Sequence, residues 1–525
     1  MHRLALILIP LLFVAPRASA ITNEALLDSL QRTAFQYFWQ EANPSNGLIK
    51  DRNASWSPCS IASLGFGLSA ICIGIDHGWV TREAGRGRVL TALETLWSKP
   101  QGSGSGGVIG YQGFYYHFLD MSFGTRTWDC ELSTIDTALL FAGMIDAKQY
   151  FTTADPLDVR VRELADSIYY RADWEWFRNH NPGIMMGWKP NTGFSGFGQW
   201  IGYNEAMILY ILAAGSPTRP VSNPAQAWNA WTSGYDWWTY YGYTYLNFPP
   251  LFGHQYSHAW IDFRGLRDPY MESRGIDYFI NSTRATLAQR AYCIDNPANR
   301  AGYGPDLWGL TACDGPNGYA AHGAPPPQND DGTIAPTAAA GSIPFAPQEC
   351  LAVLQNLYNS YRQQLWGPYG FRDAFNLTVN WWGQDYIGID QGPVIVMIEN
   401  YRTGRVWQRF MRNADVQRGL AACGFLPVAG VPGMEPVQAP LQLVRAPASP
   451  ARESGPLVLR LGQPGTVTLE VADVAGRRMT ESVLGPWPAG DHTVSWPTDG
   501  WPGGVYFYRL WSGPGRLEGR IVLVR

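Results

Sequence analysis

Three segments of the chain place carboxylates at or just before the start of a strongly apolar helix. The first, RTWDCELSTIDTALLFAGMI, holds Glu131 and Asp136. The second, FGQWIGYNEAMILYILA, holds Glu205, and the third, GQDYIGIDQGPVIVMIENYRTG, holds Asp390 and Glu399. Two carboxyl groups that face one bond can act as proton donor and proton acceptor when their surroundings drive their pKa values apart. These segments are therefore the first candidates for a catalytic site.

Asp136 also has a purely structural interpretation. Ser133-Thr-Ile-Asp136 fits the capping pattern [ST]-x-x-[DE], in which the acid only satisfies backbone N–H groups. Glu131 precedes the capping residue, so it does not take part in capping. Five residues of helix correspond to about 140° of rotation, so Glu131 and Asp136 can share a site only if Glu131 still lies in the loop.

Glu205 opens an apolar helix and follows Trp200 and Tyr203. Apolar and aromatic neighbours raise the pKa of a carboxyl group, which suits a general acid. The alternative is a favourable interaction between Glu205 and the helix N-terminus.

The third segment carries two acids with different expectations. Asp390 precedes Pro393, a helix-start signal, and is a candidate ligand-binding residue or base. Glu399 lies nine residues further on, so it must be buried and paired. We predict a structural ion pair for Glu399, with Arg402 or Arg372 as its partner.

A long irregular stretch, Pro305–Pro347, has no helical or strand period and is crowded with Gly and Pro. It nevertheless carries Trp308, Asp314 and Tyr319. Loops longer than about fifteen residues inside compact domains are usually functional or disordered, and disordered segments lack aromatics. We predict an ordered loop across a site, the alternative being an unstructured insertion.

Few other patterns suggest chemistry. His254 and His258 stand four residues apart, but no H-E-x-x-H motif is present. The chain has no Gly-rich phosphate loop, no CxxC pair and no nucleophile elbow. We therefore expect no metal and no cofactor.

The composition favours a particular class of ligand. Of 525 residues 14% are aromatic, with 23 Trp, and the net charge is −4. A balanced charge provides no field for nucleic acid or an anionic membrane. Aromatic faces stack on the apolar faces of sugar rings, so the composition favours carbohydrate; the alternative is core packing by aromatics.

The first twenty residues read as a secretory signal peptide, with a short apolar core and an Ala18-Ser19-Ala20 cleavage site. That core is too short for a membrane span. We therefore expect an exported protein. We also expect it to be a monomer. Seven Cys remain, so full pairing within one chain is excluded, and Cys293 and Cys313 are the best disulfide candidates.

Residues 21–425 alternate helical segments with Gly/Trp-rich loops, and about a dozen helices in pairs suit an all-α (α/α)6 toroid barrel of six inner and six outer helices. An α-solenoid is the alternative, disfavoured because no fixed-period repeat is present. The predicted helices are Glu24–Glu41, Ile61–Ile75, Arg82–Leu96, Thr134–Phe151, Asp155–Tyr170, Glu205–Ala214, Ala225–Thr232, Tyr278–Ile294, Pro347–Leu365, Pro393–Tyr401 and Arg405–Asn413. The segment 108–120 reads as a β-hairpin.

Residues 426–455 are Pro-rich and read as a linker. Residues 456–525 then hold six or seven short alternating strands, which predict a small all-β immunoglobulin-like sandwich. The pattern V-x-D-x-x-G-R, G-x-H-x-x-x-W and P-x-G-V-Y-F-Y-R-L resembles the FlgD-like domains and the related sorting domains of type IX secretion. This resemblance implies anchoring or sorting, through contact with secretion machinery or the cell surface.

Seven segments of the barrel region resemble the glycoamylase-like domain of glycoside hydrolase family 144: FQYFWQEANPSNGLIKDR, LSTIDTALLFAG, GYNEAM, WGLTACDGPNGY, TIAPTAAAGSIPFAP, GFRDAFN and DQGPVIVMIENYRTG. The resemblance covers residues 35–425. It implies an (α/α)6 barrel that cleaves β-1,2-glucan, in endo fashion and with inversion. By position Glu205, Asp136 and Glu131 are the expected catalytic acids. The expected substrate-binding residues are Trp200, Tyr203, His254, Trp308, Asp314, Tyr319, Arg372, Asp373, Trp381, Trp382 and Asp390.

Three other functions stay open at this point. An exo-acting glucosidase or transglycosylase would result if the long loop blocked one end of the groove. A polysaccharide lyase would use His254 and Tyr256 as acid and base, although the balanced charge disfavours its uronic acid substrates. A glycan-binding surface protein would use the barrel as a receptor and the sandwich as an anchor.

Overall fold

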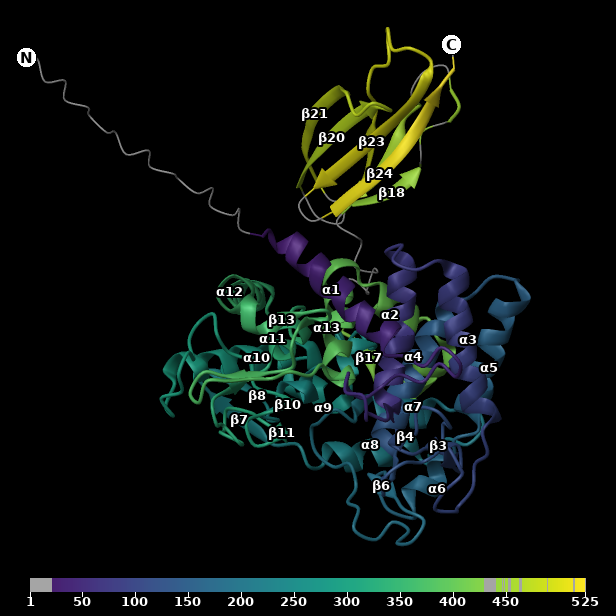
Figure 1. The fold of residues 1–525 in the computed structure, drawn as a ribbon, viewed down its shortest axis with the longest axis vertical. Coiled ribbons are helices and arrows are strands. Elements are labelled where there is room, and N and C mark those ends of the chain that lie inside the picture. Colours follow the sequence, from purple (N-terminus) through teal and green to yellow (C-terminus); the bar gives the residue numbers. More distant parts are fainter. Residues whose placement is uncertain are drawn as a thin grey trace, which may run out of the picture.

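The structure is a computed structural model that describes residues 21–428, 441–445, 447, 449–451, 455–461, 465–488, 490–512 and 515–524. Figure 1 shows the helix-rich body and the separate β-rich C-terminal part. The predicted signal peptide, residues 1–20, lies outside the described residues, and so does much of the predicted linker, including residues 429–440.

The predicted helices are confirmed to within a few residues, apart from the start of one at Pro393. Four helices, α6, α9, α11 and α15, were not predicted: α6, α9 and α11 have at most six residues, too few for a period to emerge, whereas the nine-residue α15 was missed despite its length. Within the described residues the α-helices are α1 (Asn23–Gln40), α2 (Ile61–Asp76), α3 (Arg82–Ser98), α4 (Thr134–Tyr150), α5 (Pro156–Tyr170), α6 (Trp174–Arg178), α7 (Met207–Gly215), α8 (Pro224–Thr232), α9 (Pro269–Arg274), α10 (Tyr278–Asp295), α11 (Pro336–Gly341), α12 (Pro347–Leu365), α13 (Gly388–Thr403), α14 (Arg405–Met411) and α15 (Ala414–Ala422).

The helices form an inner and an outer layer. Helices α2, α4, α7, α11 and α13 are buried along nearly their whole length, whereas α1, α3, α5 and α12 bury one face only. Inner neighbours follow the order α7, α4, α2, α13, α11. An inner helix lacks solvent contact and is apolar all round, while an outer helix is amphipathic.

Two 3₁₀ turns occupy the place where a sixth inner helix was predicted: η1 (Leu251–His254) and η2 (Ser257–Ala259). Ser257 Oγ accepts the N–H of Ile208 in α7 at 3.0 Å, and Gln255 Nε2 donates to the carbonyl of Ala338 in α11 at 2.9 Å. These turns therefore join the two ends of the inner layer. The sixth inner position of the ring is therefore filled by 3₁₀ turns in place of an α-helix.

Two glycines allow the tightest contact of the inner layer. A Cβ on Gly143 of α4 would lie 1.9 Å from the carbonyl oxygen of Gly65 in α2. Any side chain at either position would push the two helices apart, so the backbones pack directly. This fits the small-residue run at the start of α2.

Short β-pairs gather where the chain enters the inner helices: β1 leads directly into α2, β5 into α4 and β12 towards α11. We call this end of the barrel the mouth. In Figure 1 the strands β3, β4 and β6 lie below α2 and α4. The barrel strands are β1 (Cys59–Ser60), β2 (Gly110–Tyr111), β3 (Phe114–Tyr115), β4 (Phe118–Leu119), β5 (Leu132–Ser133), β6 (Gly187–Trp188), β7 (Trp237–Tyr240), β8 (Tyr243–Leu246), β9 (Leu266–Arg267), β10 (Ala312–Cys313), β11 (Ala320–Ala321), β12 (Thr333–Ile334), β13 (Trp366–Gly367), β14 (Gly370–Phe371), β15 (Phe375–Asn376), β16 (Trp381–Trp382) and β17 (Leu426–Pro427).

The hairpin predicted over residues 108–120 is confirmed, since β2 pairs with β3 in antiparallel register. The long stretch Pro305–Pro347 is ordered but not irregular throughout. Its first half forms the β10–β11 hairpin, and its second half contains β12 and the fully buried helix α11. An Ala-rich helix of six residues has no polar face. Its sequence therefore shows no helical period, and α11 was not predicted.

The C-terminal part is a two-sheet antiparallel unit with its own apolar core. One sheet has the order β18-β19-β22 and the other β21-β20-β23-β24. A strand, β18, falls inside the predicted linker and pairs with β19. The strands are β18 (Leu441–Arg445), β19 (Leu457–Leu461), β20 (Gly465–Asp473), β21 (Arg478–Trp487), β22 (Gly490–Val494), β23 (Gly504–Ser512) and β24 (Gly515–Leu523).

All seven cysteines are buried free thiols. Cys293 packs in the main core, whereas Cys313 belongs to a small cluster with Ala335 and Ala374. The proposed disulfide between Cys293 and Cys313 is therefore absent. Among the described helices none is both long and apolar enough to cross a bilayer.

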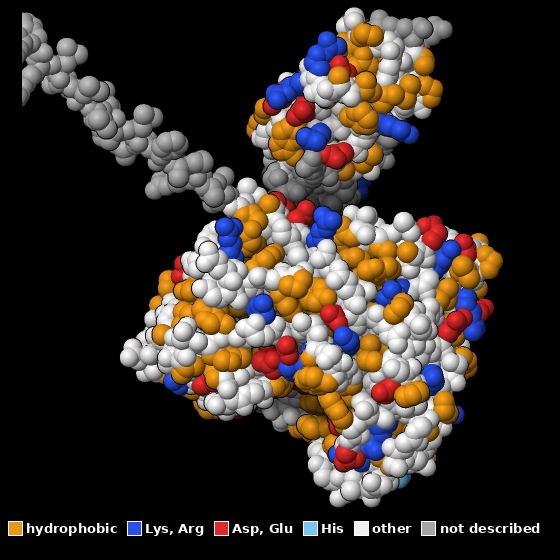
Figure 2. Space-filling model, in the orientation of Figure 1, with side chains coloured by type: hydrophobic (Ala, Val, Ile, Leu, Met, Phe, Trp, Pro, Cys, Tyr) orange, Lys and Arg blue, Asp and Glu red, His pale blue; other side chains and the backbone are white. Residues whose placement is uncertain are grey.

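On the face that Figure 2 shows, basic and acidic side chains are interspersed. This pattern agrees with the small net charge of −4. A mixed surface of this kind provides no strong field to attract a polyanion.

Candidate active site

The mouth collects carboxylates from segments far apart in the sequence. Asp136 acts electrostatically on both Asp51 and Glu205, and Asp390 is acted on by Asp373 and Asp51. All five groups therefore lie within one electrostatic cluster, which we call the mouth cluster. It forms because the inner helices start at the same end of the barrel.

Glu205 lies in the turn just before α7, not inside the helix as predicted. Asn204 Oδ1 accepts the N–H of Ala206, and Ser257 Oγ donates to the Glu205 carbonyl at 2.8 Å. These two contacts fix the turn that carries Glu205. Burial, with a smaller contribution from the charge of Asp136, raises the pKa of Glu205 to about 7. A carboxyl group protonated near neutral pH can act as a general acid.

Asp136 and Glu131 meet around one histidine. His117 Nδ1 lies 3.0 Å from Glu131 Oε1, and His117 Nε2 lies 3.7 Å from Asp136 Oδ1. Burial disfavours the imidazolium, but the charge of Asp136 and the hydrogen bond to Glu131 outweigh it and raise the pKa of His117 to about 9. Glu131 lies in the loop before β5 and not in the helix. The condition for Glu131 and Asp136 to share a site is therefore met.

Capping of α4 is realised by Ser133, whereas the Asp136 carboxylate accepts no backbone N–H among the described residues. Ser133 Oγ accepts the backbone N–H of Asp136 at 3.2 Å, and the same hydroxyl donates to the Asp136 carboxylate. The Ser133 hydroxyl engages Asp136 Oδ2, so Oδ1 remains available to face His117. Capping by Ser133 and a place for Asp136 in the site are therefore compatible.

Asp373 and Asp390 form a buried pair of like charges. Burial and the charge of Asp314 raise the pKa of Asp373 to about 7. Burial and the charge of Asp373 raise the pKa of Asp390 well above its ordinary value. Two carboxyl groups this close cannot both ionise. Oδ2 of Asp390 has no hydrogen-bond partner in the described part of the chain.

Arg52 is a cation whose charge acts on Asp373. Its guanidinium binds Asp314 at 3.0 Å and Asp385 at 3.2 Å. The Asp314 N–H in turn donates to Asp373 Oδ2 at 2.6 Å. Arg52 thus orders Asp314 at the tip of the β10–β11 hairpin but leaves Asp373 without a cation of its own.

Tyrosine hydroxyls complete the cluster. The pKa of Tyr319 is raised by burial of its hydroxyl end and by the charges of Asp390 and Asp373, although the residue as a whole is 48% exposed. Tyr256 is buried, and the charges of Asp390, Tyr319 and Glu205 act on it. Both phenols remain neutral donors at neutral pH.

Helix α13 begins at Gly388, five residues before the predicted start at Pro393. Proline has no N–H to donate to the carbonyl four residues earlier, which belongs to Ile389. The Tyr256 hydroxyl donates to that carbonyl instead, at 3.2 Å. Thr337 holds the Asp390 carbonyl at 2.7 Å. These contacts let the helix extend past the proline and fix Asp390 in its first turn.

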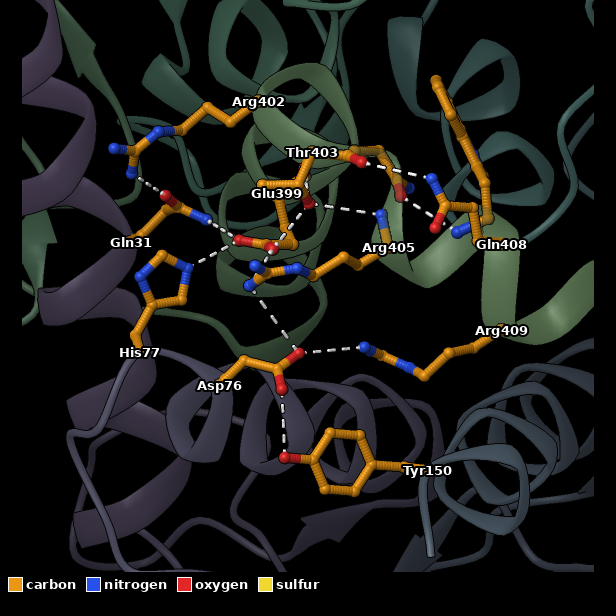
Figure 3. Close-up of polar contacts among 12 residues, drawn as sticks. Gln31, Asp76, His77, Tyr150, Glu399, Arg402, Thr403, Arg405, Gln408 and Arg409 are labelled. Carbon is orange, nitrogen blue, oxygen red and sulfur yellow. Dashed lines mark hydrogen bonds and ion pairs between the residues drawn. The ribbon is translucent and has the colours of Figure 1, made fainter. Parts of the chain in front are cut away.

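Glu399 belongs to a second polar network near the other end of α13 (Figure 3). It binds Gln31 Nε2 at 2.9 Å and His77 Nε2 at 2.8 Å, with Arg405 at 3.8 Å. The predicted structural ion pair is confirmed, but its partners are His77 and Arg405. Arg402 bonds to Gln31, Asp28 and Glu24 instead, and Arg372 bonds to Gln384.

Several residues predicted to bind substrate lie in the core instead. Trp308 is fully buried, Tyr203 is 5% exposed, and His254 is fully buried with a pKa that burial lowers to about 3. Large aromatic and His side chains are common in cores. Sequence spacing does not distinguish a core position from a substrate-binding position. A buried neutral His254 also removes the acid that a lyase would need.

The other predicted residues lie at the periphery. Trp200 is half-buried, and its Nε1 donates to Thr134 Oγ1 at the start of α4, 3.0 Å away. Trp381 and Trp382 form β16, where Trp382 stacks on Phe375 at 5.3 Å. No direct contact joins these rings to the mouth cluster among the described residues.

Sequence reasoning missed Asp51, Arg52 and His117 as site residues. Asp51 and Arg52 end the segment GLIKDR, which was singled out only for its resemblance. His117 stands in the predicted hairpin beside four aromatics. A charged pair or a histidine in an aromatic loop next to a carboxylate segment is the signal that could have revealed them.

Comparisons with known proteins identify relatives of this chain. Residues 198–414 match the family model described as putative glucoamylase. The chain is 34% identical over 434 residues to an exo β-1,2-glucooligosaccharide sophorohydrolase (non-reducing end) of Parabacteroides distasonis, a match that covers 76% of this chain. The chain spans 58% of the length of that curated relative.

Two solved structures are similar over nearly their whole length. A putative glucoamylase from Bacteroides uniformis is 39% identical with a TM-score of 0.72, covering 78% of this chain and 99% of that one. An endo-β-1,2-glucanase from Chitinophaga pinensis, in complex with sophorotriose and glucose, is 33% identical with a TM-score of 0.71, covering 78% and 99%.

Proposed function

Because this chain belongs to the glycoamylase-like family of glycoside hydrolases, which has β-1,2-glucanases among its members, we propose that it hydrolyses β-1,2-glucan at the mouth cluster. The observation that carries the proposal is the half-buried carboxyl group of Glu205, which pairs with no cation within the described residues and whose pKa is raised to about 7. A proton donor poised near neutral pH is what glycosidic bond cleavage requires.

In the proposed mechanism Glu205 donates its proton to the glycosidic oxygen as the C1–O bond breaks. Asp136 accepts a proton from the water whose oxygen bonds to C1. His117 Nε2 lies 3.7 Å from Asp136 Oδ1 and faces this carboxylate. After product release, solvent returns a proton to Glu205 and removes one from Asp136.

Asp390 is a second candidate for the base. Its Oδ2 has no hydrogen-bond partner within the described residues, and it shares a buried site with Asp373. The D136N and D390N variants distinguish the two. The base variant is expected to lose at least a hundredfold in kcat, and the other variant is expected to lose affinity more than rate.

The proposal includes endo action, supported by near-complete coverage of an endo-acting glucanase, and inversion, which the resemblance to glycoside hydrolase family 144 implies. The exo alternative is favoured by one specific observation, the 34% identity to an exo-acting sophorohydrolase. A fresh digest followed by ¹H NMR distinguishes inversion from retention, because the first-formed anomer differs.

Product analysis of the full chain on linear β-1,2-glucan, beside β-1,3-glucan and starch, tests this proposal. A ladder of β-1,2-oligosaccharides is expected. A single short product would replace endo by exo action, and activity on starch alone would reject the proposed linkage. Binding without turnover would instead favour the glycan receptor.

We also propose that the protein is exported and that the C-terminal sandwich anchors or sorts it. The signal-like residues 1–20 and the FlgD-like strand pattern support this. Fractionation of expressing cells tests it: the full chain should lie outside the cytoplasm, and a variant lacking residues 441–525 should change its final location but not its activity.

A further inference from the structure

Two exposed tryptophans stand at the rim of the mouth cluster. Trp56 is 64% exposed and Trp128 is 55% exposed. Their ring centroids lie 6.4 Å apart, with the planes tilted by 40°. Single exposed aromatics are common on protein surfaces and need no explanation, but a pair contributed by two separate loops is a built feature.

Each ring is connected to a residue of the candidate site. The Arg52 guanidinium lies 5.8 Å from the centre of the Trp56 ring and binds Asp314. On the other side Trp128 packs on Phe118 at 5.0 Å, and Phe118 stacks on His117 at 3.9 Å. The two rings therefore have fixed positions relative to the mouth cluster.

The backbone at Trp128 is strained. Its φ angle is +55°, in the left-handed region that bulky residues rarely adopt. Neighbouring contacts enforce this conformation: Arg126 Nε donates to the Cys130 carbonyl at 2.7 Å, and Asp129 binds both Arg126 and Lys189. Strain of this kind persists where the surroundings over-determine it, and it clusters at ligand clamps.

We propose that Trp56 and Trp128 form a subsite that holds a glucosyl unit of the substrate remote from the cleaved bond. The apolar face of a pyranose ring matches an exposed indole, and the neighbouring charges of Arg52, Asp129 and Lys189 match its hydroxyl groups. A subsite outside the acid cluster can be filled only by a chain long enough to reach it. Trp56 and Trp128 therefore make long glucan chains the preferred substrates. This inference rests on the proposed function.

The test measures binding by isothermal titration calorimetry, with the full chain carrying E205Q to prevent turnover. The ligands are β-1,2-linked oligosaccharides of increasing length and the polymer. W56A and W128A should each weaken binding of the long ligands about tenfold, the scale of one aromatic stacking contact. The affinity for the disaccharide should change less than twofold, and W56F and W128F should recover most of the loss.

Trp97 provides a matched control. It is 42% exposed on the outer helix α3, and the Arg171 guanidinium lies 5.0 Å from its ring. W97A should bind every ligand as the parent does, and circular dichroism melts show whether each variant is folded. Equal affinities for W56A, W128A and the parent would overturn the subsite alone, as would a loss that does not grow with chain length. If the E205Q parent binds no β-1,2-glucan of any length, the proposed function and the subsite both fail.

Discussion

The two ends of helix α13 carry buried carboxylates of opposite character. Asp390 stands in the first turn and Glu399 lies nine residues on, about 13.5 Å along the axis. Glu399 is surrounded by His77, Arg405, Thr403 and Gln31 (Figure 3). Burial alone would raise the pKa of Glu399, but the hydrogen bond and the charge of His77 outweigh burial and lower this pKa to about 2. Asp390 has another carboxyl group as its neighbour, and its pKa is raised.

The Glu399 network has the pairing expected of a structural site, whereas the mouth cluster has the pairing expected of a reactive site. The Glu399 network has a cation or a donor for each carboxylate, as a buried ion pair must. The mouth cluster contains more carboxylates than cations, and the pKa values of Asp51, Glu205, Asp373 and Asp390 are raised. Such an arrangement disfavours the folded state and persists because it poises groups for reaction.

The largest expected effect is on catalysis at the mouth. E205Q removes the proton donor but keeps the shape, so kcat should fall by about 10²–10⁴-fold while the melting temperature stays within a few degrees. Initial rates on linear β-1,2-glucan measure this. E94Q, at an exposed position of the outer helix α3, is the control; an E205Q rate within tenfold of the parent would contradict the assignment.

The opposite result is expected at the other end of α13. E399Q leaves His77 and Arg405 without their anion, so the free energy of unfolding should fall by about 3 kcal/mol, with kcat retained in the folded fraction. Urea titration measures the loss. Since the folded pKa is lowered, this stabilisation is complete above the ordinary value of 4.5 and disappears as the pH falls towards 2. A variant as stable as the parent at pH 7 would reject a structural role for Glu399.

The raised pKa of Glu205 sets the pH dependence of the reaction. A general acid must be protonated, and the proton is lost as pH rises through about 7. kcat/KM should therefore fall about tenfold per pH unit above that value. Rates between pH 4 and 10 check this, and a profile that stays flat to pH 9 would exclude Glu205 as the donor.

The smallest expected effect is a gain in stability. Asp373 is buried beside Asp390 and Asp314, and its pKa is raised to about 7. The folded state therefore binds this proton more tightly than the unfolded state, and the stabilisation is lost as pH rises through 7. D373N should raise the free energy of unfolding by about 1 kcal/mol at pH 8 and by less at pH 4, while lowering activity. Denaturant titrations at both pH values measure the change, and a loss at pH 8 would contradict the comparison.

Periodicity and capping located the long helices and the carboxylates at their starts, because both are local properties. The pairing of Glu131 with Asp136 through His117 is not local, since the histidine comes from a separate hairpin. The 3₁₀ turns that replace a sixth inner helix are too short to have a period. Burial of Trp308 and His254 depends on tertiary packing, which composition does not encode. The identity of the Glu399 partners likewise required the fold.

The most direct test of the account is the ionisation of Glu205 itself. Infrared difference spectra of the parent minus E205Q, recorded across pH 4–9, isolate the carboxyl band of this one residue. The account predicts a protonated carboxyl band that disappears with a midpoint near pH 7. A midpoint near the ordinary value of 4.5 would contradict it, because Glu205 would then be ionised at neutral pH like the paired acid at the other end of the barrel.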